Sequence, residues 1–321
     1  MVRAMFVRAA TVLAVFVFAH SAASAQEQLK VSVGGRGGFD HQISEVGQQQ
    51  GLFKQHGLAL EVRYGQGGGE TLQAVIAGVA DVGVSVGTLA TLGAFAKGAP
   101  IRVVGSAMIG AAEFWYVPAN SRIKSLKEAT GKKVAYAATG AASNLMVLGL
   151  QELHGVKFQP VATGDAAATL ARVMSGQADV GYSVPPFAVA ELEQEKIRIV
   201  GRGNDLPALA RQTVSFIIVN AAALEQRPDA IRRYLQGYRD TVEWLFSSDP
   251  QATAAYAGWA GVAESVARRT RDDFIAKQNA LPDQISGLDT IMADAVTYKV
   301  VGAPLTTEQA RTLIQLQPPI K

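Results

Sequence analysis

The chain has 321 residues, 30 Lys and Arg against 27 Asp and Glu, and no cysteine. A charge balance this close to neutral shows no global preference for nucleic acid or for an anionic membrane. The missing cysteine excludes disulfides and a lipid-modified cysteine anchor, and a chain of this length favours two cores over one.

The N-terminus has the layout of a cleavable secretory signal. Arg3 and Arg8 precede an apolar run at 9–19, and the small residues at 23–25 suit a signal peptidase. The run is shorter than the roughly 20 residues that span a bilayer. We therefore predict that residues 1–25 are a signal peptide and that the mature chain is a soluble protein of the periplasm.

The sequence repeats itself once, at an offset of 98 positions. Residues 51–86 align with residues 149–184 without a gap, and 14 of these 36 positions are identical. Ordinary residue frequencies would give only about two or three matches by chance. Because a solenoid needs more and shorter copies, the repeat predicts two lobes of one design.

Strands and helices alternate within each copy. We expect strands at 30–33 and 59–64 in the first copy and at 133–137 and 157–162 in the second. A segment with apolar residues at helical spacing follows the second strand of each copy. This alternation predicts an α/β fold of two doubly wound lobes, each with a mainly parallel sheet covered on both faces.

Two β-prone runs, 114–117 and 215–219, follow the two copies. We predict that they form a two-strand hinge, with crossings near 113–117 and 214–219. The remainder of the chain is helical in pattern from Pro228 onward and is expected to return to the first lobe. Lobe 1 is therefore predicted to comprise residues 26–112 and 220–321, and lobe 2 residues 113–219.

Ligands of open α/β sheets bind beyond the carboxyl ends of the strands, where loops and helix N-termini converge. Two such edges that face each other across a hinge form a cleft, so the candidate residues are those that follow each strand. They are Arg36, Phe39, Gly68, Gly69, Ser85, Thr88, Thr139, Gly140, Ala141, Ser143 and Tyr182. Glu113 is added to them because it lies at the predicted crossing between the lobes.

The candidate residues suit two kinds of ligand. Arg36 can neutralise an anion, and the amides and hydroxyls at 139–144 form a helix start that suits a carboxylate, sulfonate or phosphate. Phe39 and Tyr182 offer ring faces to an aromatic compound. Each pattern also has a structural explanation, such as a solvated arginine in a flexible turn or a helix N-cap at Ser143.

Nothing in the sequence resembles a catalytic device. Asp81 and Asp179 occupy equivalent positions of the two copies, which predicts a structural role rather than acid–base chemistry. The histidines lack metal-ligand spacing, and no nucleophile elbow or Walker pattern is present. We therefore predict a binding protein that is not an enzyme and that uses no cofactor and no metal.

Several motifs in a fixed order carry a resemblance to a known family. They are Glu45-(x)5-Gly51-Leu52-Phe53-(x)3-Gly57-Leu58, the stretch 72–83, Leu126-(x)4-Gly131-Lys132-Lys133-Val134, Thr139-Gly140 and Gly176-Gln177-Ala178-Asp179. The chain resembles the periplasmic solute-binding proteins of ABC transporters of the nitrate/sulfonate/taurine type, which are SsuA-like and include binders of thiamine-pyrimidine precursors.

The resemblance implies a bilobal protein that closes on a small molecule by hinge motion and delivers it to an inner-membrane permease with a cytoplasmic ATPase. It places the loops at 36–39, 67–69 and 139–143, with Ser85 and Tyr182, in the cleft. Family members that make a thiamine pyrimidine use cysteine-bearing iron sites, and this chain has no cysteine.

We predict that the ligand is a small organic anion, such as a sulfonate or a carboxylate. Two alternatives stay open: an aromatic or pyrimidine-type ligand on the same fold, and a ligand-sensing partner of a signalling receptor. The protein is expected to be a monomer that binds no nucleic acid.

Overall fold

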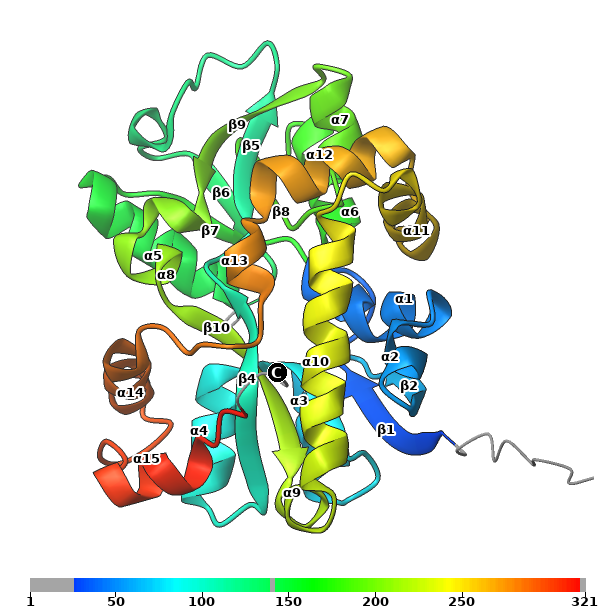
Figure 1. Cartoon of the computed structure of the whole chain (residues 1–321). Helices are drawn as coiled ribbons and strands as arrows, with labels where there is room; N and C mark the ends of the chain where they lie inside the picture. The colour runs from blue at the N-terminus through cyan, green and yellow to red at the C-terminus, as the bar shows by residue number, and fades with distance from the viewer. Residues whose placement is uncertain (1–25, 139–141, 318–321) are drawn as a thin grey trace, which may run out of the picture.

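The computed structural model describes residues 26–138 and 142–317, which form two α/β lobes (Figure 1). The predicted signal peptide and three candidate residues, Thr139, Gly140 and Ala141, lie outside the described residues. Among the helices that are described, none combines the length and the apolarity needed to span a bilayer.

The first lobe is built on a five-stranded sheet in the order β2-β1-β3-β10-β4. Its strands are β1 (Glu27–Val33), β2 (Leu58–Tyr64), β3 (Val82–Gly87), β4 (Ile101–Ile109) and β10 (Thr213–Asn220). The helices are α1 (Ile43–Gln49), α2 (Leu52–Gln55), α3 (Gly68–Ile76), α4 (Thr88–Ala96), α9 (Ala221–Gln226), α10 (Pro228–Leu245), α14 (Leu288–Thr297) and α15 (Thr307–Leu313), with the 3-10 helix η1 (Phe39–Gln42).

The second lobe contains the sheets β8-β5-β9 and β6-β7, which a parallel bridge between Val134 and Val180 joins. Its strands are β5 (Phe114–Pro118), β6 (Lys133–Tyr136), β7 (Gln159–Ala162), β8 (Gly181–Ser183) and β9 (Ile197–Arg202). Its helices are α5 (Ala142–His154), α6 (Ala166–Met174), α7 (Val189–Glu193) and α8 (Pro207–Ala210), with the 3-10 helices η2 (Leu126–Glu128) and η3 (Gly203–Asp205).

The internal repeat of the sequence is also a repeat of topology. The second lobe reads β7-β6-β8-β5-β9, which matches β2-β1-β3-β10-β4 strand for strand. In each lobe the repeat aspartate accepts a hydrogen bond of 2.8 Å from a strand amide: Asp81 from Lys30, and Asp179 from Lys133. The structural role predicted for both aspartates is therefore confirmed.

Both sheets are mixed rather than mainly parallel. In the first sheet, β1 runs parallel to β2 and β3, but β10 is antiparallel to β3 and β4. β5 has the same antiparallel position in the second lobe. Each of these strands enters its sheet from the other lobe, so it runs against the strands of the repeat.

The structure corrects the predicted second crossing at 214–219. These residues form most of β10, which lies inside the first sheet, and residues 216–219 are buried there. An apolar run of this kind is more stable between two sheet neighbours than in an exposed linker. The first predicted crossing, 113–117, is corrected in the same way, because residues 114–117 form most of β5 inside the second sheet. The segments between the two sheets are instead 110–113 and 203–212.

A third connection between the lobes comes from the C-terminal region, through α11 (Pro250–Ala260), α12 (Glu264–Phe274) and α13 (Lys277–Ala280). The helix α12 packs on α7 of the second lobe (Figure 1), where Ser265 donates to Glu193 over 3.0 Å. The Phe274 ring lies 5.2 Å from that of Phe114. This region was expected to return to the first lobe, and it contacts the second lobe as well.

The long helix α10 covers the first sheet with the apolar face that the sequence predicts. Ile231, Tyr234, Leu235, Tyr238, Val242 and Leu245 are all buried. Tyr234 stacks on Phe53, with ring centroids 5.5 Å apart. This packing fixes α1 and α2 against the sheet and places η1, which joins β1 to α1, at the edge that faces the second lobe.

Candidate functional site

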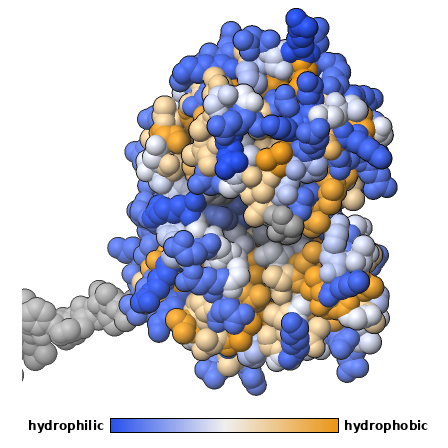
Figure 2. All heavy atoms as spheres, turned by 180° about the vertical axis from the view of Figure 1, so that it is seen from behind, coloured by the Kyte–Doolittle hydropathy of each residue, from blue (hydrophilic) through white to orange (hydrophobic). Residues whose placement is uncertain are grey.

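A cavity of about 620 Å³ lies between the lobes, in the range of pockets that hold small organic ligands. The first lobe contributes Gly38, Phe39, Asp40, His41, Ser85, Gly87, Thr88, Leu89, Ala90, Met108, Val214, Ser215, Thr290, Asp294 and Tyr298. The second lobe and the connections contribute Gly110, Ala111, Ala112, Glu113, Ala142, Leu145, Met146, Gly149, Val184, Pro185, Leu206, Ala208, Leu209, Gln212 and Ile275. The surface is hollowed between the two halves of the molecule (Figure 2).

Asp40 is one of the two carboxylates that the first lobe contributes to the described wall, and it is held in η1 after β1. Its Oδ2 accepts hydrogen bonds from Ser85 Oγ at 2.5 Å and from Ser215 Oγ at 3.3 Å. His41 Nε2 lies 4.0 Å from the other carboxylate oxygen, Oδ1. Residues from η1, β3 and β10 therefore meet at one acidic group in the cavity wall.

Ser85 occupies a left-handed backbone conformation at the end of β3, with a φ of 64°. This conformation is unfavourable for a residue with a side chain, and such outliers gather at functional sites. The same turn brings its carbonyl close to α3, because a Cβ on Gly68 would lie only 2.9 Å from Ser85 O. Gly68 therefore allows the backbone of α3 to pack closely against the end of β3, and it does not line the cavity.

Glu113 lies in the segment that connects β4 with β5 and lines the same cavity. Apart from its own backbone amide, its carboxyl has no hydrogen-bonding or ionic partner among the described residues. Burial, and to a smaller extent the charge of Asp40, raises the pKa of the Glu113 carboxyl above its ordinary value. The cavity therefore contains an uncompensated acid.

Gln212 supplies a further acceptor without a donor. It is 5% exposed, its Nε2 donates to Asp294 Oδ2 over 3.3 Å, and its Oε1 has no partner among the described residues. An unpaired polar atom in a buried position costs free energy of about 1–3 kcal/mol. Such an atom in the wall of a cavity is a natural contact for a ligand that donates a hydrogen bond.

Arg36, which the sequence suggested as an anion contact, does not line this cavity. Its guanidinium pairs with Glu45 at 2.7 Å and lies over the Tyr64 ring, 4.4 Å from the centroid. Glu45 also accepts from Tyr64 at 2.5 Å and from Trp259 at 3.1 Å. Burial opposes ionisation, but these hydrogen bonds together with Arg36 hold the pKa of Glu45 below its ordinary value.

The described cavity wall brings together four of the predicted residues: Phe39, Ser85, Thr88 and Glu113. Ser143 and Tyr182 have structural roles instead. The Ser143 hydroxyl accepts a hydrogen bond from the Ala137 amide at 3.0 Å, and the Tyr182 hydroxyl donates to the Gly164 carbonyl over 2.8 Å. Gly69, the last glycine of the loop at 67–69, lies outside the wall as well.

Sequence reasoning missed Asp40, His41, Gln212, Ser215 and Asp294 as parts of the wall. Asp40 directly follows Phe39 in a loop that the sequence did single out, so its carboxylate was a usable signal. Gln212 and Ser215 enter the wall because β10 lies between β3 and β4. The pattern of the sequence contained no such information.

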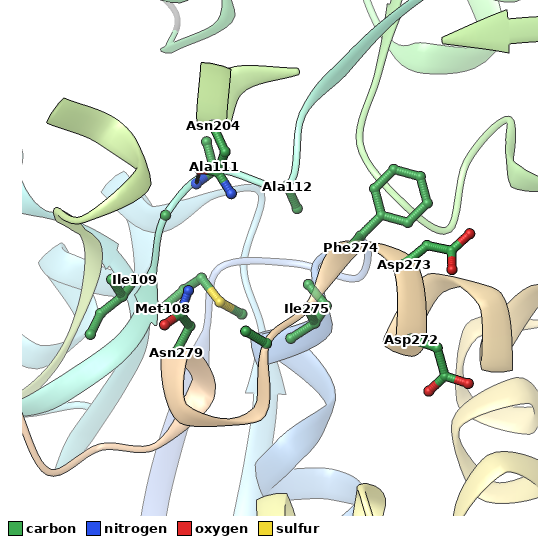
Figure 3. A pocket seen from close by; sticks show the side chains of 12 residues that line it. Met108, Ile109, Ala111, Ala112, Asn204, Asp272, Asp273, Phe274, Ile275 and Asn279 are labelled. Carbon is green, nitrogen blue, oxygen red and sulfur yellow. Dashed lines mark hydrogen bonds between the residues drawn. The ribbon is translucent and has the colours of Figure 1, made fainter. Parts of the chain in front are cut away.

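A smaller hollow of about 260 Å³ lies against the same connection between the lobes (Figure 3). It shares Met108, Ile275 and residues 110–112 with the larger cavity. Figure 3 shows Phe274 and Ile275 near Ala112, where the chain leaves α12 for α13. Residues 110–112 of the connection therefore line both hollows.

Two repeated α/β lobes, joined by several chain segments around a ligand-sized cavity, define the bilobal periplasmic-binding-protein fold. A family model described as NMT1/THI5 like matches residues 39–253. The chain belongs to this family.

Several of the similar proteins are binding proteins by name. The putative aliphatic sulfonates-binding protein of Escherichia coli (strain K12) is 29% identical over 266 residues, which are 79% of this chain and 78% of that protein. The crystal structure of the periplasmic aliphatic sulphonate binding protein SsuA from Escherichia coli has a TM-score of 0.73 at 22% identity and covers 92% of this chain and 94% of that chain.

The periplasmic nitrate-binding protein NrtA from Synechocystis PCC 6803 has a TM-score of 0.61 at 14% identity, with coverage of 89% of this chain and 84% of that chain. At such identities, the solved structures establish a common fold. They do not carry the ligand over, because side chains rather than the fold select it.

Proposed function

We propose that this protein is the solute-binding subunit of a bacterial ABC importer, which captures a small organic molecule in the periplasm and delivers it to a membrane permease with a cytoplasmic ATPase. The observation that carries the proposal is the cavity of about 620 Å³, which both lobes line. Membership of the NMT1/THI5-like family and the names of the relatives support the transport role.

Closure of the lobes gives a physical mechanism. A ligand that contacts both lobes favours the closed arrangement by its difference in affinity for the two states. The segments 110–113 and 203–212 are hydrogen-bonded to each other at both ends, through Gly110 N to Gln212 O and Gly203 N to Glu113 O. Gly110, with a φ of 76°, provides a left-handed position at which this hinge can turn.

The charge of the ligand is the finer part of the proposal. The sulfonate names of the relatives and the N-termini of α4 and α5 in the cavity wall support the organic anion predicted from the sequence. The side chains oppose it, because the described wall contains Asp40, Glu113 and Asp294 but no Lys or Arg. These acidic groups favour the alternative of an organic molecule, such as an aromatic one, that donates hydrogen bonds.

Native mass spectrometry tests the binding site. The mature protein, exposed to cell extract, is expected to retain an adduct that is lost on unfolding. Leu145→Trp, which fills the cavity from α5, should abolish the adduct. Leu148→Trp is the matched control, because it changes a residue of the same helix that is 48% exposed. An adduct that persists in Leu145→Trp would place the ligand elsewhere.

The transport role needs a second measurement. The loaded protein should stimulate the ATPase of its permease in proteoliposomes, and Leu145→Trp should not. Binding without stimulation of any permease encoded beside it would favour the ligand-sensing role. Turnover of the bound molecule, seen as a change in the adduct mass with time, would instead indicate an enzyme.

A further inference from the structure

The wall of the inter-lobe cavity offers hydrogen-bond acceptors from three separate segments. Asp40 belongs to η1, Glu113 to the connection between β4 and β5, and Gln212 to the segment before β10. The Glu113 carboxyl and Gln212 Oε1 have no side-chain or ionic partner among the described residues. Acceptors that lack donors in the protein are complementary to a ligand that brings donors.

The charges in the same wall are one-sided. Asp40, Glu113 and Asp294 are acidic, and His41 is the nearest cationic candidate, 4.0 Å from Asp40. An anionic ligand beside Asp40 and Glu113 would be repelled by their carboxylates. The repulsion would be strong, because charges interact more strongly in a partly desolvated site than in water. A cation would relieve the repulsion between the two carboxyls and provide the missing counter-charge.

The rest of the wall is largely apolar. Phe39, Met108, Leu145, Met146, Leu209 and Ile275 surround the polar groups. Phe39 is held in place by Tyr256 and Phe246, with ring centroids 5.4 and 5.5 Å away. A rigid aromatic face beside carboxylates suits a flat or apolar body that carries a positively charged nitrogen.

We propose that the ligand of this cavity is an organic cation, an amine or amidine on an apolar or aromatic body, whose nitrogen is bound by Asp40 and Glu113. The inference rests on the proposed function as a solute-binding protein and specifies the chemical class of the solute. The unpaired Gln212 oxygen would accept a further hydrogen bond from the ligand. Selectivity against organic anions would then come from the two carboxylates.

Three probes of similar shape and different charge test the proposal: benzamidine, benzamide and benzoate. We expect benzamidine at millimolar concentration to raise the Tm of the mature protein and to give a measurable Kd by titration calorimetry. Benzamide should bind more weakly, and benzoate should not bind. Tighter binding of benzoate than of benzamidine, or no binding of benzamidine, would overturn the proposed ligand class.

The variant Glu113→Gln tests whether benzamidine binds at Glu113 in the cavity wall. Its carboxyl supports no other described side chain, so the fold should persist. We expect benzamidine affinity to fall about tenfold to a hundredfold, as for the loss of one charge-assisted hydrogen bond. Glu225→Gln removes one negative charge from an exposed position on α9 and should leave the affinity unchanged. Equal loss in the two variants, or no loss in Glu113→Gln, would contradict the site.

Failure of this inference and failure of the proposed function give different results. If the adduct retained from cell extract is an anion that Leu145→Trp abolishes, the protein is a solute-binding protein of a different ligand class. If Leu145→Trp leaves the adduct in place, the cavity is not the binding site, and the proposed function itself falls.

Discussion

Ser85 donates its hydroxyl to the carboxylate of Asp40 over 2.5 Å, from a left-handed backbone at the end of β3. The bond joins the carboxyl edge of the first sheet to η1 and aims an acidic group at the space between the lobes. Ser215 adds a second, longer hydrogen bond of 3.3 Å from β10. The position of Asp40 therefore depends on three segments that are far apart in the sequence.

Two substitutions of Ser85 distinguish the contribution of its hydrogen bond to stability from the cost of its left-handed backbone. Ser85→Ala should lower the free energy of unfolding by about 1.5–3 kcal/mol, because a hydrogen bond to a charged group is lost. Ser85→Gly loses the same bond but relieves the left-handed conformation, so it should be about 1 kcal/mol more stable than Ser85→Ala. Urea unfolding measures both, and the opposite order would show that Ser85 is not strained.

Glu113 should make the stability of the ligand-free protein depend on pH. Its pKa in the folded protein lies above the ordinary 4.5, because of burial and the nearby Asp40 charge. The folded state thus binds this proton more tightly than the unfolded state, and stability falls as the pH rises from 4.5 through the folded-state pKa. We expect Glu113→Gln to raise the Tm at pH 7 and to bring no gain below pH 4.5.

Thermal unfolding between pH 4 and pH 8 checks this prediction. The other titratable groups in the cavity wall are Asp40, His41, Asp294 and Tyr298, and the substitution leaves all of them in place. The Tm difference between the two proteins therefore reports the charge of Glu113 together with its interaction with Asp40. A difference that does not change with pH would mean that the pKa of Glu113 is not raised in the folded protein.

Gly68 and Gly69 form a matched pair that distinguishes a structural role from a ligand contact. A Cβ on Gly68 would lie 2.9 Å from the Ser85 carbonyl, whereas a Cβ on Gly69 would have no neighbour within 4 Å. Gly68→Ala should cost about 1–3 kcal/mol of stability, as overpacking does. Gly69→Ala should be neutral or stabilise α3 by up to about 1 kcal/mol. Comparable losses in urea unfolding would contradict this account.

Arg36→Ala tests whether Arg36 contacts the ligand, as the sequence suggested, or is held away from the cavity, as the structure shows. An anion contact would make affinity fall sharply, but the Arg36 side chain is bound to Glu45 and lies over Tyr64. We expect ligand affinity in calorimetry to stay within about twofold and stability to fall by about 1 kcal/mol, as for a half-exposed ion pair. A large loss of affinity would return Arg36 to the binding site.

Phe274 anchors α12 on the second lobe. Its ring contacts Phe114, and the Arg202 guanidinium lies 4.6 Å from the ring centroid. Phe274→Ala should destabilise the protein by about 2–3 kcal/mol and speed hydrogen exchange in α12. Phe187→Ala changes a ring that is 49% exposed and serves as the control. Unchanged exchange in α12 would show that this helix does not depend on the anchor.

The cavity shows where prediction from sequence reached its limit. Phe39, Ser85 and Thr88 were found because loops after parallel strands meet at one edge of a sheet, and Glu113 because it lies at the predicted crossing between the lobes. Arg36 was expected in the wall on the same ground, but Glu45 and the Tyr64 ring hold its guanidinium elsewhere. Position in the chain placed the backbone near the site, and it did not determine where a long side chain points.

The two-lobed design was determined by the sequence alone, because an internal repeat with hydrophobic periodicity leaves each copy a core of its own. The helical faces of α10 and the equivalent roles of Asp81 and Asp179 follow from local patterns in the same way. Only the tertiary structure placed β10 inside the first sheet and α12 on the second lobe. Both depend on contacts between residues that are more than a hundred positions apart or on opposite lobes. The acidic character of the cavity also depends on the tertiary structure, because only the fold brings Asp40 and Glu113 into one wall.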